Sequence, residues 1–545
     1  MTIQELNLLW PEIVLLIGAV ACLFCGMSRK LAFRRATTML TLVTLLVALF
    51  FVRRPPTEVA RELLDETSMP QFIKMWMLVI SLLLWTLASG LPGKMRQTRE
   101  NDIATPLTFD PAYSVRGEFF GFFLFSLAGA MLCVSASDLA WLFLALELTS
   151  LPTYVLVATM RDNPQSQESG VKYFFLGAMA AAIFLYGFTL IYGATGSTVF
   201  REIHATAATL TGNQYAMLVL GVSLSVIGIG FKIAAFPMYF YTADVYQGAA
   251  TPVTTFLAFV PKTAGMISLV LILGLVGWPL PEPITALLWV MAAATMIAGN
   301  VLGLLQSNVK RALAYSSVAH SGYMIIGLIA GTTAAASSDY SSTSETGNIL
   351  GSALGNGLAG VLFYLIAYGF ANFAAFAVLG CIERGGDEAQ TYDDLSGLVH
   401  RDPKLAVVML VAMLSLLGIP PLVGFLGKVY IFEAAINTGS NAMVALVVLA
   451  VICSAVSAVY YLRIASVCFF GQPVSPVTIT SGPLRITGAG IAALAAVLYG
   501  LFGAPLVESA HKASHNLSPK ITQLESTPTN EATASAQSQS VSLKH

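Results

Sequence analysis

Residues 253–276 read VTTFLAFVPKTAGMISLVLILGLV, an apolar run that contains one proline, Pro261, and one charged residue, Lys262. A helix needs about 20 apolar residues to cross the hydrocarbon core of a bilayer, and this run is long enough. A charge within such a helix is costly, so it usually faces a protein interior and has a function. The run therefore predicts a membrane-spanning helix that carries a buried amine.

The composition of the whole chain agrees with a membrane protein. Hydrophobic residues make up 56% of the 545 residues and charged residues only 10%, whereas about 25% of the residues in a soluble domain are charged. This composition excludes a soluble globular fold. The formal net charge of -1 leaves no excess of basic side chains for phosphate backbones, so we expect no nucleic-acid partner.

Apolar runs of similar length recur along the chain, and they predict an all-α polytopic fold with about fourteen membrane-spanning helices. The runs lie approximately at residues 8–27, 36–52, 75–91, 119–135, 139–160, 172–194, 215–236, 253–276, 284–305, 309–330, 358–382, 405–436, 443–470 and 486–502. Two polar stretches, residues 332–356 and the tail from Ser509 onward, are expected to lack regular structure. His511 and His515 in that tail are expected to be solvated.

The loops between the runs indicate how the chain crosses the membrane. Lys and Arg gather in the loops after odd-numbered runs, such as Arg34 and Arg35 after the first and Lys310 and Arg311 after the ninth; the even-numbered loops hold few, Lys74 among them. Loops on the cytoplasmic side of membrane proteins are enriched in Lys and Arg. We therefore expect the odd-numbered loops in the cytoplasm and both termini on the outer side of the membrane.

Ionisable side chains inside the apolar runs are the candidate functional residues. They are Glu147, Lys172, Lys232, Lys262, His320, Lys428 and Glu433. Lys172 and Glu433 lie nearer the helix ends, so reaching the headgroups is an equal alternative to function for these two. Because the lysines outnumber the acids, they cannot all be charged and paired in a dry interior. We expect some of them to gain and lose a proton, which is the elementary step of a proton relay.

Other polar or helix-breaking residues accompany these charges. Prolines lie near four of them, at Pro152, Pro237, Pro261 and the pair Pro420 and Pro421. A proline frees a backbone carbonyl, which in a membrane must be satisfied by protein or water. Broken helices beside buried charges therefore predict hydrated cavities near the midplane, as in transporters.

Polar residues also recur at helical spacing near the charges. Tyr364, Tyr368 and Asn372 share one face of the run at 358–382, and Ser316 precedes His320 by one turn. Hydrogen bonding between helices explains such stripes as well as a proton path does. His320 is the exception, because an imidazole titrates near neutral pH.

The sequence offers no means of capturing chemical energy on this chain. It has no phosphate-binding glycine loop and no ligand spacing for haem or iron–sulfur clusters, and its six cysteines are scattered. We expect no cofactor and no metal here, so uphill proton movement must be driven by a partner chain or an ion gradient. A stand-alone cation/proton antiporter and a scaffold subunit without transport remain alternatives.

Five stretches of sequence carry a family resemblance. They are GFKIAAFP at residues 230–237, TADVYQGAATP at 242–252, PKTAG at 261–265, NVKRALAYSSVAHSGY at 308–323 and GIPPLVGFLGK at 418–428. Together they resemble the N subunits of bacterial NADH-quinone oxidoreductase, respiratory complex I, which are antiporter-like membrane proteins. The resemblance extends over about residues 8–505. One departure is Tyr239, where the family commonly has a histidine.

The resemblance implies fourteen helices that include two inverted five-helix repeats, with the seventh and twelfth helices broken. It divides the chain into three N-terminal helices (1–116), two repeats (117–277 and 278–470), a last helix (471–508) and a polar tail (509–545). It also implies that Glu147 and Lys232 form a charge pair in one half-channel, that Lys262 is central, and that Lys428 is terminal in the other half. His320 would belong to the hydrated path, and Lys172 is a further candidate.

The family also implies partners and a location for the chain. The other membrane subunits of the oxidoreductase would surround it, and NADH, FMN, iron–sulfur clusters and quinone would bind on partner subunits. Quinone reduction elsewhere in the complex would drive proton transfer. The expected location is the inner membrane of a bacterium.

Overall fold

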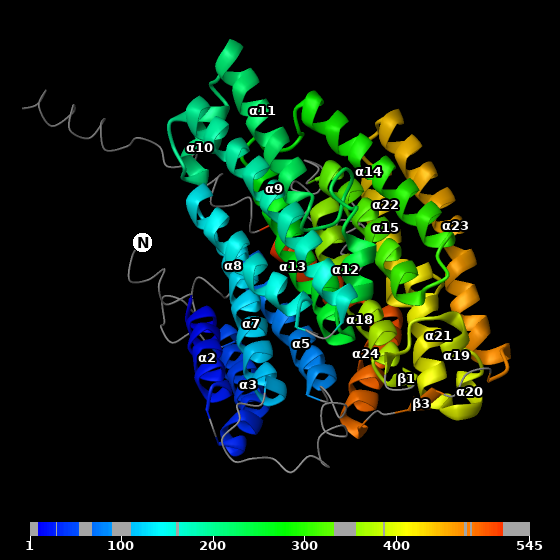
Figure 1. Cartoon of the computed structure of the whole chain (residues 1–545). Helices are drawn as coiled ribbons and strands as arrows, with labels where there is room; N and C mark the ends of the chain where they lie inside the picture. The colour runs from blue at the N-terminus through cyan, green and yellow to red at the C-terminus, as the bar shows by residue number, and fades with distance from the viewer. Residues whose placement is uncertain are drawn as a thin grey trace, which may run out of the picture.

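The computed structural model describes residues 9–28, 30–53, 68–89, 111–159, 163–331, 356–384, 387–473, 477–479 and 482–515. Its long helices are α2 (Trp10–Gly26), α3 (Leu31–Arg53), α5 (Met69–Ala88), α7 (Pro111–Val134), α8 (Leu139–Val157), α9 (Pro164–Thr195), α11 (Gly212–Ile229), α13 (Thr251–Gly274), α14 (Glu282–Leu304), α15 (Val309–Ala330), α18 (Gly357–Leu379), α21 (Pro403–Leu417), α22 (Val423–Ile436), α23 (Asn441–Phe470) and α24 (Pro483–Leu501). They lie side by side in one bundle, with α2 and α3 at one edge and α23 at the other (Figure 1).

The helices confirm the predicted polytopic all-α fold. Twelve of the described helices are long and apolar enough to cross a membrane, and α2 and α21 are shorter apolar helices. Each of the fourteen predicted runs contains a helix, and polar side chains set several of the helix starts. Asp138, Asn308 and Asp402, for example, each accept a hydrogen bond from a backbone N–H in the first turn of α8, α15 and α21, which satisfies a donor that has no partner within the helix.

Two of the predicted runs are interrupted, as the family resemblance implied. The seventh ends its regular helix, α11, at Ile229, passes through turns over residues 230–241, and continues as the short α12 (Thr242–Gly248). The twelfth is divided into α21 and α22 by residues 418–422. Gly418 there has φ of +86°, a left-handed conformation that favours glycine, and two prolines follow it. Both breaks leave backbone carbonyls without partners inside a helix.

The core of the bundle is formed by α13 and α18. Every residue of α18 is buried, as are nearly all residues of α13, which is typical of helices that are apolar all round and surrounded by other helices. α18 contacts α5, α13, α15, α21, α22 and α24. By contrast, α3, α9 and α23 expose apolar side chains along their outer faces, as expected of helices that meet lipid or a partner subunit.

The two predicted five-helix groups have similar internal contacts. In the first group α7 packs against α8, α8 against α9, and α13 against both α7 and α8; in the second α14 packs against α15, α15 against α18, and α23 against both α14 and α15. The third helix of each group packs along the interrupted one. This shared pattern is consistent with a repeat, while the inverted symmetry and the domain boundaries stay predictions.

Smaller elements complete the ends of the bundle. They are α10 (Phe200–Ala207), α19 (Tyr392–Leu395), α20 (Leu398–Arg401), α25 (Ala504–His515) and a sheet of β1 (Ile382–Arg384), β2 (Asp387–Glu388) and β3 (Val477–Ile479) in the order β2-β1-β3. The sheet is antiparallel, with Glu383 opposite Glu388. None of these elements was predicted from the sequence.

The predicted start of the polar tail at Ser509 is wrong for its first residues. α25 continues to His515, and the side chain of His511 is buried with 4% exposure rather than solvated. Leu506, Ala510 and Ala513 recur at helical spacing, so a narrow stripe of small apolar residues packs against α5 and α18. The side chain of His515, residues 516–545 and residues 332–355 of the predicted polar stretch at 332–356 lie outside the described part.

The crossing of α2 and α7 provides a test of the packing. A Cβ atom added at Gly26 would lie 2.6 Å from the Cα atom of Gly117, so the two backbones meet with no room for a side chain. We expect Gly26→Ala to destabilise the protein by about 1–3 kcal/mol, the usual cost of overpacking. Thermal unfolding of the purified protein in detergent measures this loss.

Gly490 on α24 is the matched control, because an added Cβ there meets nothing within 4 Å. Gly490→Ala should leave the unfolding temperature unchanged or raise it, since alanine favours a helix over glycine by about 1 kcal/mol. An unchanged unfolding temperature in Gly26→Ala would show that the two helices do not cross this closely.

Candidate functional site

Lys262 lies at the centre of the bundle on the most buried part of α13, with 2% exposure. Its Nζ atom donates to the hydroxyls of Ser317 at 2.7 Å and Ser321 at 2.9 Å, and to the Ser317 carbonyl. The ring centroid of Tyr368 lies 5.0 Å from the amine, close enough for a cation–π contact. Among the described residues no carboxylate pairs with Lys262, so hydroxyls, a carbonyl and a ring solvate the amine.

Lys232 lies in the break after α11 and is also buried. Its Nζ atom donates to the Ser150 hydroxyl and, at 3.5 Å, to the Leu146 carbonyl. Glu147 lies on α8, the helix that also carries Leu146 and Ser150, but it does not approach Lys232 within ion-pair distance. One buried carboxylate oxygen of Glu147 has no hydrogen-bond partner among the described residues. The structure thus brings the two charges to neighbouring positions without a direct salt bridge.

A serine links the surroundings of Lys232 and Lys262. The Ser321 hydroxyl, which accepts a hydrogen bond from Lys262, donates to the carbonyl of Ile233, the residue after Lys232. Gly265 permits this approach, because a Cβ atom there would lie 2.7 Å from the Cβ of Lys232. The broken helix and α13 therefore meet at the point where each carries its lysine.

His320 continues the polar chain on the other side of Lys262. Its Nδ1 atom lies 2.5 Å from the Tyr364 hydroxyl and its Nε2 atom 3.0 Å from the Tyr461 hydroxyl. The Tyr368 ring, which lies over Lys262, has its centroid 5.2 Å from the imidazole centroid. With both ring nitrogens bonded, the imidazole can receive a proton on one side and release it on the other.

Lys428 ends the chain at the break in the twelfth predicted helix. Its Nζ atom donates to the carbonyls of Leu417 at 2.7 Å and Leu416 at 3.2 Å, and to the Ser454 hydroxyl at 2.9 Å. The two carbonyls belong to the last turn of α21, where they lack helical partners and the helix dipole attracts a cation. The break thus creates the site of the amine.

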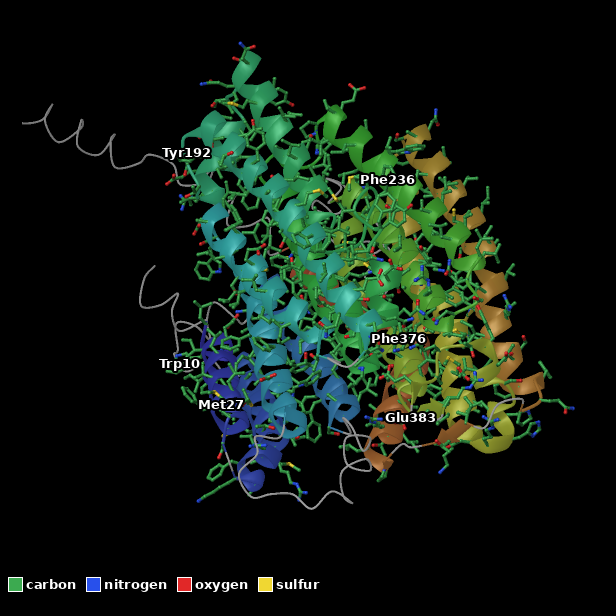
Figure 2. All side chains as sticks on the ribbon, in the orientation of Figure 1. Trp10, Met27, Tyr192, Phe236, Phe376 and Glu383 are labelled. Atoms are coloured by element: carbon green, nitrogen blue, oxygen red, sulfur yellow. The ribbon has the colours of Figure 1, made fainter. Side chains whose placement is uncertain are left out.

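Tyr323 connects the last two groups. The Tyr323 ring centroid lies 5.1 Å from the Lys428 amine and 5.8 Å from the His320 ring. The order of groups through the protein is therefore Lys232, Lys262, His320 and Lys428, joined by serine and tyrosine side chains. Side chains fill the space between the helices (Figure 2), so this polar chain is embedded in packed protein.

The remaining candidates lie apart from this chain. Lys172 is 41% exposed and forms ion pairs at 2.7 Å with Glu168 and Asp244, while Glu433 is half-buried on α22 beyond Lys428. Tyr239 stacks on the neighbouring Phe240 ring. A proton-transfer role for Lys172 stays a prediction.

Two buried ion pairs were missed because their lysines were assigned to loops. Lys74 lies within α5, where it pairs with Glu12 of α2 at 2.6 Å, and both side chains are almost fully buried. Lys310 lies within α15 with 0% exposure and pairs with Glu388. Both lysines lie near the start of an apolar run, where a charged side chain resembles a loop residue and helix boundaries are least certain from sequence.

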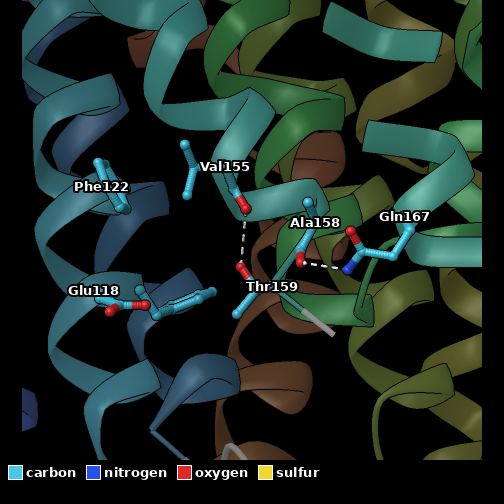
Figure 3. Close-up of a pocket in the computed structure, with 7 residues that line it drawn as sticks. Glu118, Phe122, Val155, Ala158, Thr159 and Gln167 are labelled. Atoms are coloured by element: carbon cyan, nitrogen blue, oxygen red, sulfur yellow. Dashed lines mark hydrogen bonds between the residues drawn. The ribbon is translucent and has the colours of Figure 1, made fainter. Parts of the chain in front are cut away.

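Two cavities in the described part of the protein lie outside the polar chain. One, near the loop between α8 and α9, is lined by Glu118, Phe122, Thr159 and Gln167 among others (Figure 3). Thr159 donates to the Val155 carbonyl and Gln167 to the Ala158 carbonyl there. The other is apolar and lies alongside α8 at Pro152. Neither is lined by a lysine or by His320.

Sequence comparison assigns the family. Residues 136–339 and 339–453 match the family described as NADH:quinone oxidoreductase/Mrp antiporter, transmembrane. The chain belongs to this family. The match covers both interrupted helices and all four groups of the polar chain, so the NADH:quinone oxidoreductase/Mrp antiporter family shares the part of the fold that holds the site.

Relatives within this family are N subunits. The chain is 40% identical over 355 residues to NADH-quinone oxidoreductase subunit N of Trichlorobacter lovleyi, which covers 65% of this chain and 68% of the relative. It is 34% identical to subunit N 1 of Rhizobium meliloti over 94% of this chain and 98% of the relative. These matches confirm the predicted resemblance.

Solved structures show the same fold. A chain of respiratory complex I from Thermus thermophilus with bound aureothin superposes with a TM-score of 0.69 at 31% identity, covering 91% of this chain and 98% of that one. A chain of the Mrp complex from Dietzia sp. DQ12-45-1b superposes with a TM-score of 0.72 at 20% identity, a likeness that concerns the fold alone. Within the described residues, no group of three or more His, Cys, Asp or Glu residues is placed to hold a metal ion.

The hydrogen bonds of His320 give a test of the site. Tyr364→Phe removes the hydroxyl bonded to Nδ1 while it keeps the ring, so the imidazole loses one of its two proton partners. We expect proton pumping in membrane vesicles that contain the assembled complex to fall about tenfold or more, within the range by which a positioned proton-transfer group contributes.

Tyr499→Phe is the matched control, because that tyrosine packs through its ring against Trp76 and Phe370 and should tolerate loss of the hydroxyl. Equal pumping by Tyr364→Phe and the control, at equal complex content, would remove His320 from the proton path.

Proposed function

We propose that this chain is a proton-translocating membrane subunit of a NADH-quinone oxidoreductase. The observation that carries the proposal is the buried series of Lys232, Lys262, His320 and Lys428, whose amines contact hydroxyls and carbonyls instead of carboxylates. Moving such an amine from protonated to neutral breaks no salt bridge, so a nearby charge change is enough to shift its proton. The relatives named as N subunits support the identity of the complex.

In this proposal a proton moves along the series in short steps. Lys232 and the neighbouring Glu147 form the first station, with Glu147 biasing the lysine by its charge. Lys262 receives the proton through the Ser321 side, and His320 passes it toward Lys428. The Tyr368 hydroxyl and the Asn372 amide nitrogen are buried and have no hydrogen-bond partner among the described residues. The Tyr368 ring lies close to Lys262 and His320, and Asn372 follows one turn later on α18, so ordered water there would complete the hydrogen bonds.

The energy for this transfer comes from elsewhere in the complex. We propose that no redox centre resides on this chain, and that NADH, FMN, iron–sulfur clusters and quinone bind to partner subunits, with quinone reduction driving the relay. The two repeats at 117–277 and 278–470 would each supply half of the path. We also propose that the chain lies in a bacterial inner membrane with both termini on the outer side; the excess of Lys and Arg in odd-numbered loops supports this orientation.

Removal of the central lysine tests the proposal directly. We expect Lys262→Ala, and in a similar manner Lys232→Ala and Glu147→Ala, to reduce the ratio of protons pumped to NADH oxidised while the complex still assembles. The reason is that each substitution removes a side chain that carries a proton in the relay and leaves no titratable group in its place. Proton uptake by inverted membrane vesicles, normalised to complex content on a native gel, measures the ratio.

Lys404, on α21 and outside the polar chain, is the control lysine, and Lys404→Ala should pump normally. An unaltered pumping ratio in Lys262→Ala would instead support a scaffold role. Exchange of a cation for protons by the purified chain alone in liposomes would support the antiporter alternative.

A further inference from the structure

Glu388 contacts two core helices at one end of the bundle. It lies on β2, in the connection that follows α18, and its carboxylate oxygens accept hydrogen bonds from the Thr251 backbone N–H at 2.9 and 3.1 Å and from the Thr251 hydroxyl at 2.7 Å. The same carboxylate pairs with Lys310, which also donates to the Ala249 carbonyl at 3.3 Å. One side chain therefore joins the start of α13 to the first turn of α15.

The charge of Glu388 suits this position. Thr251 is the first residue of α13, and a carboxylate at a helix N-terminus is stabilised by unpaired N–H groups and by the helix dipole. Burial alone would raise the pKa of the Glu388 carboxyl, but the Lys310 charge and the hydrogen bonds from Lys310 and Thr251 hold that pKa below its ordinary value. The contact is therefore intact at neutral pH, and the stability that it adds is lost only as the pH falls through this lowered pKa.

The two helices that Glu388 joins carry the central lysine and its partners. Lys262 follows Thr251 by eleven residues on α13, and Ser321 follows Lys310 by eleven residues on α15. Eleven residues are about three helical turns, or about 16 Å along the axis. The Lys262–Ser321 contact thus lies the same distance from the Glu388 contact along both helices, and on the same face of each.

Because this spacing is equal, both contacts form at one and the same axial position of α13 relative to α15. Both helices run in the same direction from the Glu388 end, since the second contact involves later residues of both helices than the first. α13 packs mainly against α7, α8 and α18 and approaches α15 at few positions, so few direct contacts between the two helices fix its height relative to α15. A slide by one residue, about 1.5 Å, would separate the Lys262 amine from Ser317 and Ser321.

We propose that Glu388 is a positioning residue for proton transfer: by holding Thr251 and Lys310 together, it sets the axial register in which the Lys262 amine meets Ser317 and Ser321. The inference rests on the proposed function, because the register matters only if Lys262 carries protons. Lys310 is the second residue on which this contact depends, since its buried amine needs the Glu388 carboxylate as its counter-charge.

The experiment measures proton pumping against pH in membrane vesicles that contain the whole complex. Glu388→Gln removes the charge and leaves the length of the side chain, and Ser321→Ala removes a Lys262 partner directly. We expect both to lower pumping about tenfold or more, as misplacement of reacting groups by about 1 Å does, and to move the pH optimum in the same direction. NADH oxidation with an artificial electron acceptor should stay at the level of the unsubstituted complex.

Glu383→Gln is the matched control, because Glu383 is the cross-strand neighbour of Glu388 in the same sheet and lies near the end of the bundle (Figure 2). It should pump normally. Glu388→Asp is a second variant in case the complex with Glu388→Gln fails to assemble, since it keeps the charge and shortens the side chain by one methylene. It should assemble fully, and its pH optimum should move partway toward that of Ser321→Ala.

A normal pH profile in assembled Glu388→Asp or Glu388→Gln would overturn the positioning role. The same result together with lost pumping in Lys262→Ala would leave the proposed function intact. Normal pumping in Lys262→Ala would instead overturn the proposed function, whatever the Glu388 variants do.

Discussion

The solvation of buried amines is the constraint on which the rest of this structure depends. A lysine inside a membrane needs polar partners, because an unsolvated charge in a low-dielectric interior is unstable. Here the partners of Lys262 and Lys428 are serine hydroxyls, backbone carbonyls and tyrosine rings. Such partners solvate a charged amine, yet they do not fix its charge as a carboxylate would. The same arrangement that permits burial thus permits the proton to leave.

The breaks in two helices follow from this requirement. A regular helix uses its carbonyls internally, so it offers few acceptors to an inserted amine. Interrupting the helix after Leu417 frees two carbonyls at the negative end of α21, and Lys428 binds both. The break after α11 brings Lys232 against α8 in a similar way. The almost completely buried helices α13 and α18 form the core beside these irregular segments.

The sequence was sufficient for the polytopic helical fold and for finding the buried ionisable residues that the structure brings together, because both depend on local signals. Long apolar runs specify membrane-spanning helices, and an isolated lysine within one is conspicuous. Lys262 and Lys428 were found in this way. Glu388 was not found, since it lies in a polar connection and its contacts are with Thr251 and Lys310, which are distant in the sequence. The burial of Lys74 and His511 was also missed, because the sequence analysis assigned Lys74 to a loop and His511 to the polar tail.

The proposed relay requires that water and neutral side chains surround the lysines and carry protons between them. A high-resolution map of the assembled complex, detailed enough to place ordered water, tests this most directly. We predict water molecules that bridge Lys262 to His320 and His320 to Lys428, next to Tyr368 and Asn372. A dry interior in which each lysine forms a close ion pair with a carboxylate, from this chain or a neighbour, would contradict the account.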